Sequence, residues 1–214
     1  MSALQIEALR VKLQSVEVLR GINLAVAPGE MIGLLGRNGA GKTTTLRAIM
    51  GLVAASGGRI ACDGEDLIAL PTHRRAELGI GYMPEDRRLI PQLSVEENVL
   101  LPRWVMRGID SRVRLEFVYG LMPEVAAMHD RKALALSGGQ QKLVALARAL
   151  VVGTRLLLLD EPFEGVAPAL SRRLAEVIGM LRGKEVAVLI AQSDLNHAIK
   201  MLDREYRIER GANR

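Results

Sequence analysis

A glycine-rich loop at residues 36–43 constrains the fold of this chain more than any other feature. It reads Gly-Arg-Asn-Gly-Ala-Gly-Lys-Thr and matches the phosphate-binding pattern G-x-x-x-x-G-K-[ST]. The loop follows a short apolar run at 31–35, typical of a buried strand, and precedes a helical pattern at 44–50 that ends at Gly51. A strand, a glycine loop and a helix in this order cradle phosphate groups, so the sequence predicts an α/β fold that binds a nucleoside triphosphate.

The residues of this loop have different tasks in holding a triphosphate. The glycines allow backbone conformations that other residues avoid, and they bring N–H groups close to phosphate oxygens. Lys42 adds a positive charge that reaches the β- and γ-phosphates, and the hydroxyl of Thr43 is a ligand for Mg²⁺. The predicted nucleotide-binding residues of the loop are Gly36, Arg37, Asn38, Gly39, Ala40, Gly41, Lys42, Thr43 and Thr44.

The composition of the chain argues against several other classes of protein. The 214 residues include one cysteine, which excludes an internal disulfide framework. No uncharged apolar run is long enough to predict a membrane span. The net charge of +5 would suit nucleic acid, but the basic residues are scattered and hardly any aromatic residues lie among them. We therefore expect no nucleic-acid partner.

The strand and helix patterns divide the chain into three parts. The first, 1–84, ends in a buried strand at 80–83. The second, 85–152, is mainly helical, and Ser94 with a glutamate three residues later is typical of a helix N-terminus. The third, 153–214, alternates strands with helices, which is typical of a mostly parallel sheet covered by helices.

Apolar periodicity, glycine and proline predict the individual elements. We expect further strands at 3–10, 16–27, 58–63, 155–159, 186–191 and 206–209. We expect helices at 72–78, 169–181 and 194–201. Within 85–152 we expect interruptions of the helices at Pro102, Gly108, Gly120 and Pro123.

Four leucines at 156–159 lead directly into two acids, Asp160 and Glu161. Such a run suits a strand that is buried on both faces, and nucleotides bind at the carboxyl ends of parallel strands. We expect Asp160 to hold Mg²⁺ through water, because Mg²⁺ keeps several waters when it binds to proteins. We expect Glu161 to orient and polarise the attacking water, and Lys42 to stabilise the γ-phosphate during hydrolysis.

A third motif, Leu-Ser-Gly-Gly-Gln at 136–140, precedes a helical pattern at 141–150. On its own it indicates a capped helix N-terminus, which is a good site for an anion. The glycine loop, this motif and the leucine strand with its acids, in this order, resemble the ATP-binding cassette (ABC) ATPases, whose signature sequence is LSGGQ. The resemblance covers the chain from about Leu4 to Glu209.

The resemblance implies a single ABC ATPase domain over 1–214, with a P-loop NTPase (RecA-like) core. Residues 1–84 and 153–214 would form this nucleotide-binding core, with a mostly parallel sheet and an N-terminal antiparallel β subdomain. Residues 85–152 would form an inserted α-helical subdomain that ends in the signature motif. ATP and Mg²⁺ are the implied cofactors.

The family likeness also implies partners. Two cassettes pair head to tail, and each ATP lies between the phosphate loop of one and the signature of the other. The signature residues that would bind the partner's nucleotide are Ser137, Gly138, Gly139 and Gln140. The second ATPase subunit is either identical or different. ATP-driven closure would move integral-membrane permease subunits, with this chain peripheral on the cytoplasmic face of the inner membrane.

Segments 79–88, 94–98 and 160–168 resemble the ATPase subunits of bacterial importers for branched-chain amino acids and related amides. In such importers a periplasmic substrate-binding protein delivers the cargo to a permease pair. We therefore expect the ATP-hydrolysing motor subunit of an importer of this kind. A lipid or lipopolysaccharide exporter shares much of the pattern and stays open as an alternative. A soluble cassette in DNA repair or translation is less fitting, because long insertions and a tandem cassette are missing.

Three positions depart from the usual cassette. Glu85 stands where a glutamine normally touches Mg²⁺, and a carboxylate is also a good Mg²⁺ ligand. Gln192 aligns with the histidine that contacts the γ-phosphate, whereas His197 is expected on a helix with no such role. Leu13 or Val11 stands where an aromatic residue usually stacks on adenine, which predicts weaker ATP binding and looser base choice. These departures motivate a second hypothesis, a catalytically weak partner in a mixed cassette pair, which the retained Glu161 opposes.

Overall fold

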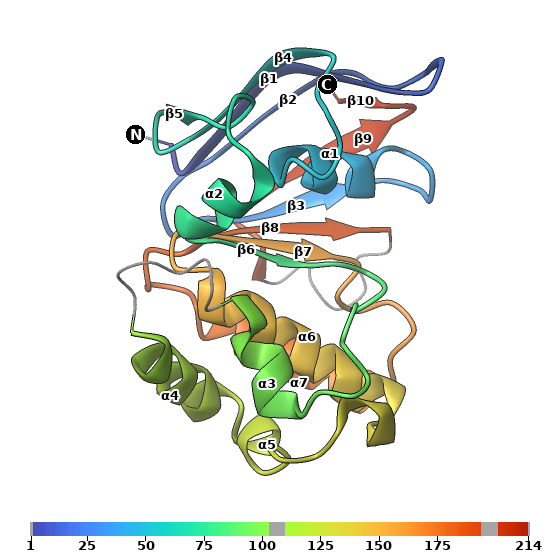
Figure 1. Cartoon of the computed structure of the whole chain (residues 1–214). Helices are drawn as coiled ribbons and strands as arrows, with labels where there is room; N and C mark the ends of the chain where they lie inside the picture. Colours follow the sequence, from blue (N-terminus) through green and yellow to red (C-terminus); the bar gives the residue numbers. More distant parts are fainter. Residues whose placement is uncertain (1, 103–109, 194–200, 214) are drawn as a thin grey trace.

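The computed structural model describes residues 2–102, 110–193 and 201–213. These residues form two β-sheets, one above the other, with the larger helices below both (Figure 1). The upper sheet is antiparallel, with strand order β2-β1-β4-β5. Its strands are β1 (Leu4–Leu13), β2 (Val16–Val26), β4 (Gly57–Cys62) and β5 (Glu65–Asp66).

The lower sheet has six strands in the order β10-β9-β3-β8-β7-β6. They are β3 (Met31–Leu35), β6 (Ile80–Met83), β7 (Leu156–Asp160), β8 (Ala187–Gln192), β9 (Arg204–Glu209) and β10 (Ala212–Asn213). All neighbours in it are parallel except β10 on β9. The predicted α/β class, with a mostly parallel sheet and an N-terminal antiparallel sheet, is confirmed.

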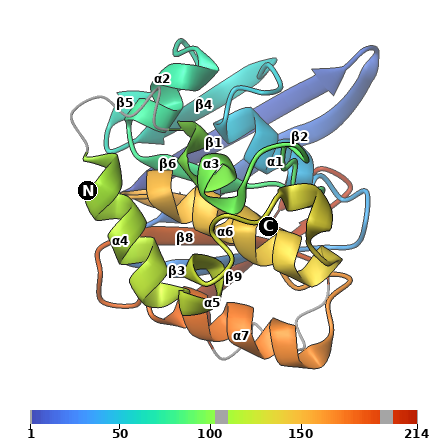
Figure 2. The same cartoon turned by 60° about the horizontal axis from the view of Figure 1, so that its bottom comes forward.

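The helices lie in two groups. Between the sheets are α1 (Lys42–Ile49) and, at their edge, α2 (Thr72–Glu77). Beneath the lower sheet are α3 (Val95–Leu100), α4 (Ser111–Leu121), α5 (Pro123–Ala126), the short 3₁₀ helix η2 (Ala133–Ala135), α6 (Gly138–Val152) and α7 (Pro168–Gly179). Figure 2 shows α6 in the middle of this group, with α3, α4, α5 and α7 around it. None of the helices in the described part has both the length and the hydropathy to cross a bilayer.

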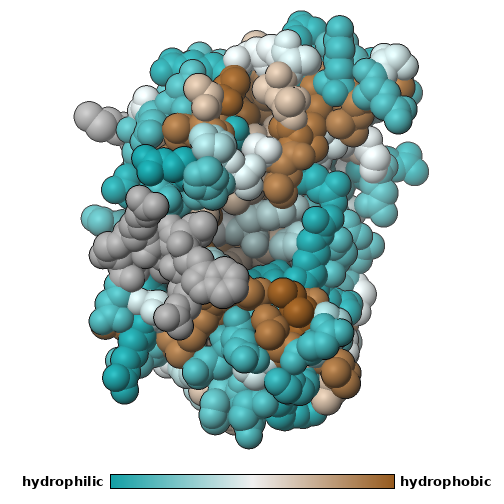
Figure 3. All heavy atoms as spheres, viewed as in Figure 1, coloured by the Kyte–Doolittle hydropathy of each residue, from teal (hydrophilic) through white to brown (hydrophobic). Residues whose placement is uncertain are grey.

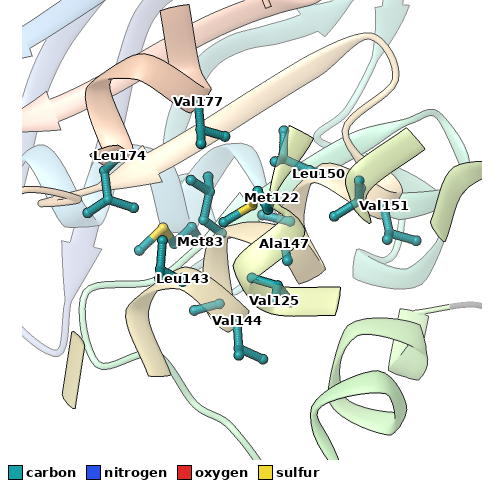
Figure 4. Packing of buried hydrophobic residues seen from close by; sticks show 14 of the residues in the cluster. Met83, Met122, Val125, Leu143, Val144, Ala147, Leu150, Val151, Leu174 and Val177 are labelled. Atoms are coloured by element: carbon teal, nitrogen blue, oxygen red, sulfur yellow. The ribbon is translucent and has the colours of Figure 1, made fainter. Parts of the chain in front are cut away.

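The strand β7 shows how the core is built on both faces of the lower sheet. Side chains alternate along a strand, so Leu156 and Leu158 pack toward α1 and the upper sheet, whereas Leu157 and Leu159 pack toward α6. On the helical side, the side chains of α6 lie between Met83 of the sheet and the residues of α5 and α7 (Figure 4). This core is continuous from the sheet through α6 to the outer helices, so the domain boundary at 152 stays a prediction.

Several elements differ from the sequence expectations. Helix α1 begins at Lys42 rather than at 44, because Gly41 in the left-handed region (φ 114°) turns the loop straight into the helix. Gly120 does not interrupt a helix, since α4 runs through it to Leu121, where Pro123 prevents continuation. The short strand β5 was not expected. The expected helix at 194–201, with His197, lies outside the described residues.

The hairpin at the end of the described chain joins the two sheets at the glycine loop. The N–H of Gly211 donates to the carbonyl of Ala40 at 2.9 Å, and the carbonyl of Gly211 accepts from the N–H of Arg20 at 2.7 Å. Only a glycine fits at 211, because a Cβ there would lie 2.0 Å from the carbonyl oxygen of Val18. Residues 211–213 therefore support the nucleotide loop from behind.

Candidate functional site

The glycine loop lies at the carboxyl end of β3, where it curls around the side chain of Lys42. The ammonium of Lys42 donates to the carbonyl oxygens of Gly36 at 2.7 Å and Arg37 at 3.3 Å, and the side chain is only 5% exposed. A Cβ at Gly36 would lie 2.3 Å from the carbonyl oxygen of Ile208, which explains the glycine there. The loop thus presents its N–H groups at the start of α1, as an anion site requires.

Two hollows border this loop. One, of about 390 Å³, is lined by Val18, Asn38, Gly39, Gly41, Lys42, Thr43, Thr44, Glu85 and Glu161. A wider one, of about 840 Å³, is lined by residues 35–40 and 207–210 and by Ser193. The smaller hollow is lined by residues that are predicted to bind phosphate, to bind Mg²⁺ and to activate water. The structure therefore brings Lys42, Thr43, Glu85 and Glu161 together.

Asp160 ends β7 and is fully buried beside Thr43. The hydroxyl of Thr43 donates to Asp160 Oδ1 at 3.0 Å, and the hydroxyl of Tyr82 donates to Oδ2 at 3.3 Å. Burial raises the pKa of Asp160 to about 6, because the charged carboxylate loses its hydration, and the hydroxyl donors only partly offset this. A cation beside Asp160 would relieve this cost.

Glu161 follows directly and turns its carboxylate toward the glycine loop. Its backbone is in the left-handed region (φ 47°), which is uncommon for a residue with a Cβ, and the residue is 3% exposed. Glu161 Oε1 lies 3.1 Å from the ammonium of Lys42, and Oε2 accepts from the N–H of Ser193 at 3.1 Å. The predicted base and the predicted phosphate-binding cation form a buried ion pair.

Ser193 is the site residue that the sequence reasoning missed. Its hydroxyl lies within hydrogen-bonding distance of Lys42 Nζ (3.0 Å), Asn38 Oδ1 (2.6 Å) and the Glu161 carboxylate. Gln192, predicted for this place, is instead 4% exposed, and its Oε1 has no hydrogen-bond partner in the described structure. The structure does not bring Gln192 to the Lys42–Glu161 pair.

Alternation along β8 gives the reason. Ile190 packs in the core on the helical side and Ala191 in the core on the α1 side, so Gln192 points back toward the helical side. Ser193 is the first residue beyond the strand, at the level of Lys42. Counting the alternation from the last apolar residue of the strand is the sequence signal that would have found it.

The exposed Glu85 lines the smaller hollow from the loop after β6. The guanidinium of Arg148 on α6 holds this loop by donating to the carbonyls of Arg87 at 2.5 Å and Arg88 at 2.7 Å. Both of these loop residues have positive φ (62° and 48°), so the loop turns sharply there. Direct contact of Glu85 with Mg²⁺ stays a prediction.

The residue types in the smaller hollow fit a magnesium ion bound together with a phosphate. Mg²⁺ prefers hard oxygen ligands and keeps several waters. The hydroxyl of Thr43 and the carboxylate of Glu85 line the hollow, the carboxylate of Asp160 lies beside Thr43, and all three are such ligands. No group of three or more His, Cys, Asp or Glu side chains converges on one point in the described residues. The ion would therefore depend on the nucleotide for part of its coordination.

The signature residues begin α6 in the helical part of the molecule (Figure 1). Ser137 caps the helix, accepting from the N–H of Gln140 at 3.3 Å, while Gln140 Oε1 accepts from the N–H of Ser137 at 3.0 Å. Ser137 and Gly138 are exposed, and none of the four residues 137–140 lines either hollow beside the glycine loop. The structure does not join the signature to this chain's own glycine loop.

Leu13 lies at the tip of the β1–β2 hairpin, paired with Val16 and 43% exposed. The smaller hollow has Val18 as its residue from this hairpin, and neither hollow has an aromatic lining residue. The position of Leu13 beside the adenine base remains a prediction.

Comparison with known proteins decides the family. The family model described as "ABC transporter" matches residues 19–164. The chain belongs to the ABC transporter family. As an ATP-binding subunit of this family it is an ATPase, and its fold is that of the P-loop NTPases.

Two relatives of this chain are named for different kinds of transport. The chain is 38% identical over 213 residues to "Lipopolysaccharide export system ATP-binding protein LptB" of Haemophilus influenzae, covering 99% of this chain and 88% of that protein. It is 36% identical over 196 residues to "High-affinity branched-chain amino acid transport ATP-binding protein BraG" of Pseudomonas aeruginosa, covering 92% and 84%. Both kinds of transport therefore occur among its relatives.

Among solved structures, the ABC subunit is similar to the ATP-binding cassette MJ0796, described as dimeric, in a post-hydrolysis state bound to ADP and Pi. The two chains are 25% identical with a TM-score of 0.87, over 98% of this chain and 96% of that one. This likeness covers both sheets and the helical part, so the architecture expected from the resemblance is confirmed.

Proposed function

We propose that this ATPase is the motor subunit of a bacterial importer for branched-chain amino acids or related compounds. The observation that carries the proposal is the likeness to BraG, together with the residues around Glu85 and Glu161 that resemble this importer group. The likeness to LptB supports the alternative, the ATPase of a lipopolysaccharide exporter. In either case the chain would lie on the cytoplasmic face of the inner membrane and bind a permease pair.

We propose the following division of labour at the site. Lys42 and the N–H groups of the loop hold the phosphates, and the carboxylate of Glu161 accepts a proton from the attacking water. Ser193 occupies the position expected of Gln192, and its hydrogen bonds keep the Lys42 ammonium and the Glu161 carboxylate in place. When bound, Mg²⁺ neutralises the charge that develops on the β- and γ-phosphates. Thr43, Asp160 and Glu85 would hold it.

A second copy, or a related cassette, completes the site in this proposal. Ser137 and Gly138 are exposed, and Gly139 and Gln140 are partly so. None of the four lines a hollow beside this chain's own glycine loop, as expected of residues that serve a partner's nucleotide. The described dimer of MJ0796 supports such pairing. The alternative of a catalytically weak partner is less favoured, because Glu161 is present and its carboxylate faces Lys42.

We propose that the permease binds this chain in a groove between the sheets and the helical part. Figure 3 shows this face hollowed between two apolar regions. A mostly apolar pocket of about 280 Å³ lies between α1, β6 and α6, with Leu52, Pro84 and Arg148 among its lining residues. Tyr82 also lines it, and its hydroxyl reaches Asp160 at 3.3 Å. A partner in the groove would thus contact Tyr82, which contacts Asp160 of the nucleotide site. Residues 85–101 are the segment to cross-link to the permease first.

Reconstitution tests the proposed cargo. The chain is co-expressed with the permeases encoded beside its gene and placed in liposomes, and ATP hydrolysis is measured with and without a periplasmic binding protein loaded with leucine or an amide. Stimulation by the loaded binding protein supports the importer. Stimulation by lipopolysaccharide in the absence of any binding protein would instead support the exporter.

A further inference from the structure

Lys142 is a buried lysine that the mechanism above does not use. It lies on α6, five residues after the capping serine, and is 2% exposed. No carboxylate lies within ion-pair distance of its ammonium in the described part of the chain. Burying an ammonium without a charged partner is unfavourable, so such a residue needs compensating hydrogen bonds.

The compensating bonds go to the backbone that carries the proposed base. The ammonium donates to the carbonyl oxygen of Glu161 at 2.9 Å and to that of Glu164 at 2.5 Å. The N–H of Glu164 also donates to the carbonyl of Glu161 at 3.2 Å, so the segment is a tight turn. Lys142 therefore closes this turn from the side of α6.

The turn needs an external support, because Glu161 adopts a backbone conformation that residues with a Cβ seldom adopt (φ 47°). This conformation sends the Glu161 carboxylate to Lys42 and Ser193. Relaxation to an ordinary backbone conformation would rotate the carboxylate away from the hollow. Two charge-assisted hydrogen bonds from Lys142 oppose that relaxation.

We propose that Lys142 is a positioning residue for hydrolysis, which fixes the Glu161 carboxylate from the opening turns of the signature helix. The inference rests on the proposed role of Glu161 as the base. Since Ser137 to Gln140 begin the same helix, any shift of α6 on engaging a partner would be passed through Lys142 to Glu161. Lys142 itself touches neither the hollow nor the nucleotide loop.

The test replaces Lys142 and separates hydrolysis from binding. Lys142→Met puts an unbranched side chain, one atom shorter, in the buried space and fills most of it, but it removes both hydrogen bonds. We expect kcat for ATP hydrolysis to fall about tenfold or more, because small displacements of a catalytic group are costly, while the Kd for a non-hydrolysable ATP analogue stays within about threefold. We expect Lys142→Gln, whose shorter amide retains a donor, to recover part of kcat.

Val144→Ala is the matched control. Val144 is fully buried on the same helix, near Val125 of α5 (Figure 4). It is two positions from Lys142, so it projects from roughly the opposite face of α6. We expect this variant to lower the melting temperature and to leave the kcat of the folded protein unchanged. A purely structural role of Lys142 would give the same result, so a Lys142→Met protein with kcat within twofold of the unchanged chain overturns the proposal.

A double variant distinguishes the inference from the proposed function. In a Glu161→Gln background, Lys142→Met should lower the residual rate by less than twofold, because both changes remove the same action. A full additional loss would overturn the positioning role. If Glu161→Gln alone hydrolyses ATP as fast as the unchanged chain, the assignment of the base fails instead. Should Lys142→Met not fold, Lys142→Gln decides: at least a threefold loss of kcat supports the proposal, and an unchanged kcat overturns it.

Discussion

The buried pair of Lys42 and Glu161 predicts that Glu161→Gln binds nucleotide more tightly than the unchanged chain. The two groups lie 3.1 Å apart with side chains 5% and 4% exposed, so the charge of Glu161 partly neutralises that of Lys42 and weakens its attraction for a phosphate. At this distance the attraction is about 5 kcal/mol at an effective dielectric constant near 20, and the lost hydration offsets most of it. A net change of about 1.4 kcal/mol, or tenfold in Kd, follows when the carboxylate becomes an amide.

Titration calorimetry with ADP in the presence of EDTA measures this change. ADP lacks the γ-phosphate, so relief of repulsion between that group and Glu161 does not contribute, and EDTA removes the metal. Glu164→Gln is the control, because it makes the same change of charge on an exposed side chain three residues away. Equal ADP affinity in the two variants would contradict the reasoning, because the Lys42–Glu161 pair would then not oppose binding.

Three further predictions follow from other contacts. Ser193→Ala should lower kcat about tenfold, and more than Gln192→Ala does, because a hydroxyl between Lys42 and Glu161 is lost; steady-state kinetics of both variants measures this. Arg75→Met should lower the free energy of unfolding by about 2–4 kcal/mol, because the guanidinium donates to three backbone carbonyls, two of them at the end of α1; urea unfolding measures it, and the exposed Arg74→Met should change little. Burial raises the pKa of the Cys62 thiol from 9.0 to about 11, so the thiolate is scarce until the pH nears 11; a thiol reagent at pH 8 should label the chain only after unfolding, and rapid labelling of the folded protein would contradict this.

The parts of the site that the sequence predicts best are those that depend on local geometry. A glycine loop between a strand and a helix, and two acids at the end of a leucine strand, keep their relative positions in any sheet of this kind, so residues 36–43, Asp160 and Glu161 were predictable. Ser193 was not, because its contact with Lys42 joins residues 151 positions apart and depends on the register of β8. Nothing in the sequence distinguishes Lys142 from other polar residues on helices, because its role depends on the packing of α6 against the turn after β7.

Gly120 and Gly41 show the same limit at the level of the fold. Both are glycines beside helical patterns, yet one lies inside α4 and the other fixes the first residue of α1. At Gly120 a Cβ would meet open space, so nothing nearby requires a break. At Gly41 the backbone is left-handed, and a Cβ would lie 2.7 Å from the side chain of Leu19. Both require a glycine there, and the helix begins at the next residue. Packing by distant residues, which local propensity does not contain, separates the two cases.

The bond between Gly211 and Ala40 has a consequence for how the protein matures on the ribosome. Translation is directional, so the phosphate cradle is synthesised early, whereas the residues that brace it emerge about 170 positions later. Until then the nascent chain carries the Lys42 segment without its support from behind. Competence to hold nucleotide thus arrives only once residue 211 has been synthesised, after the helical part has already had time to fold.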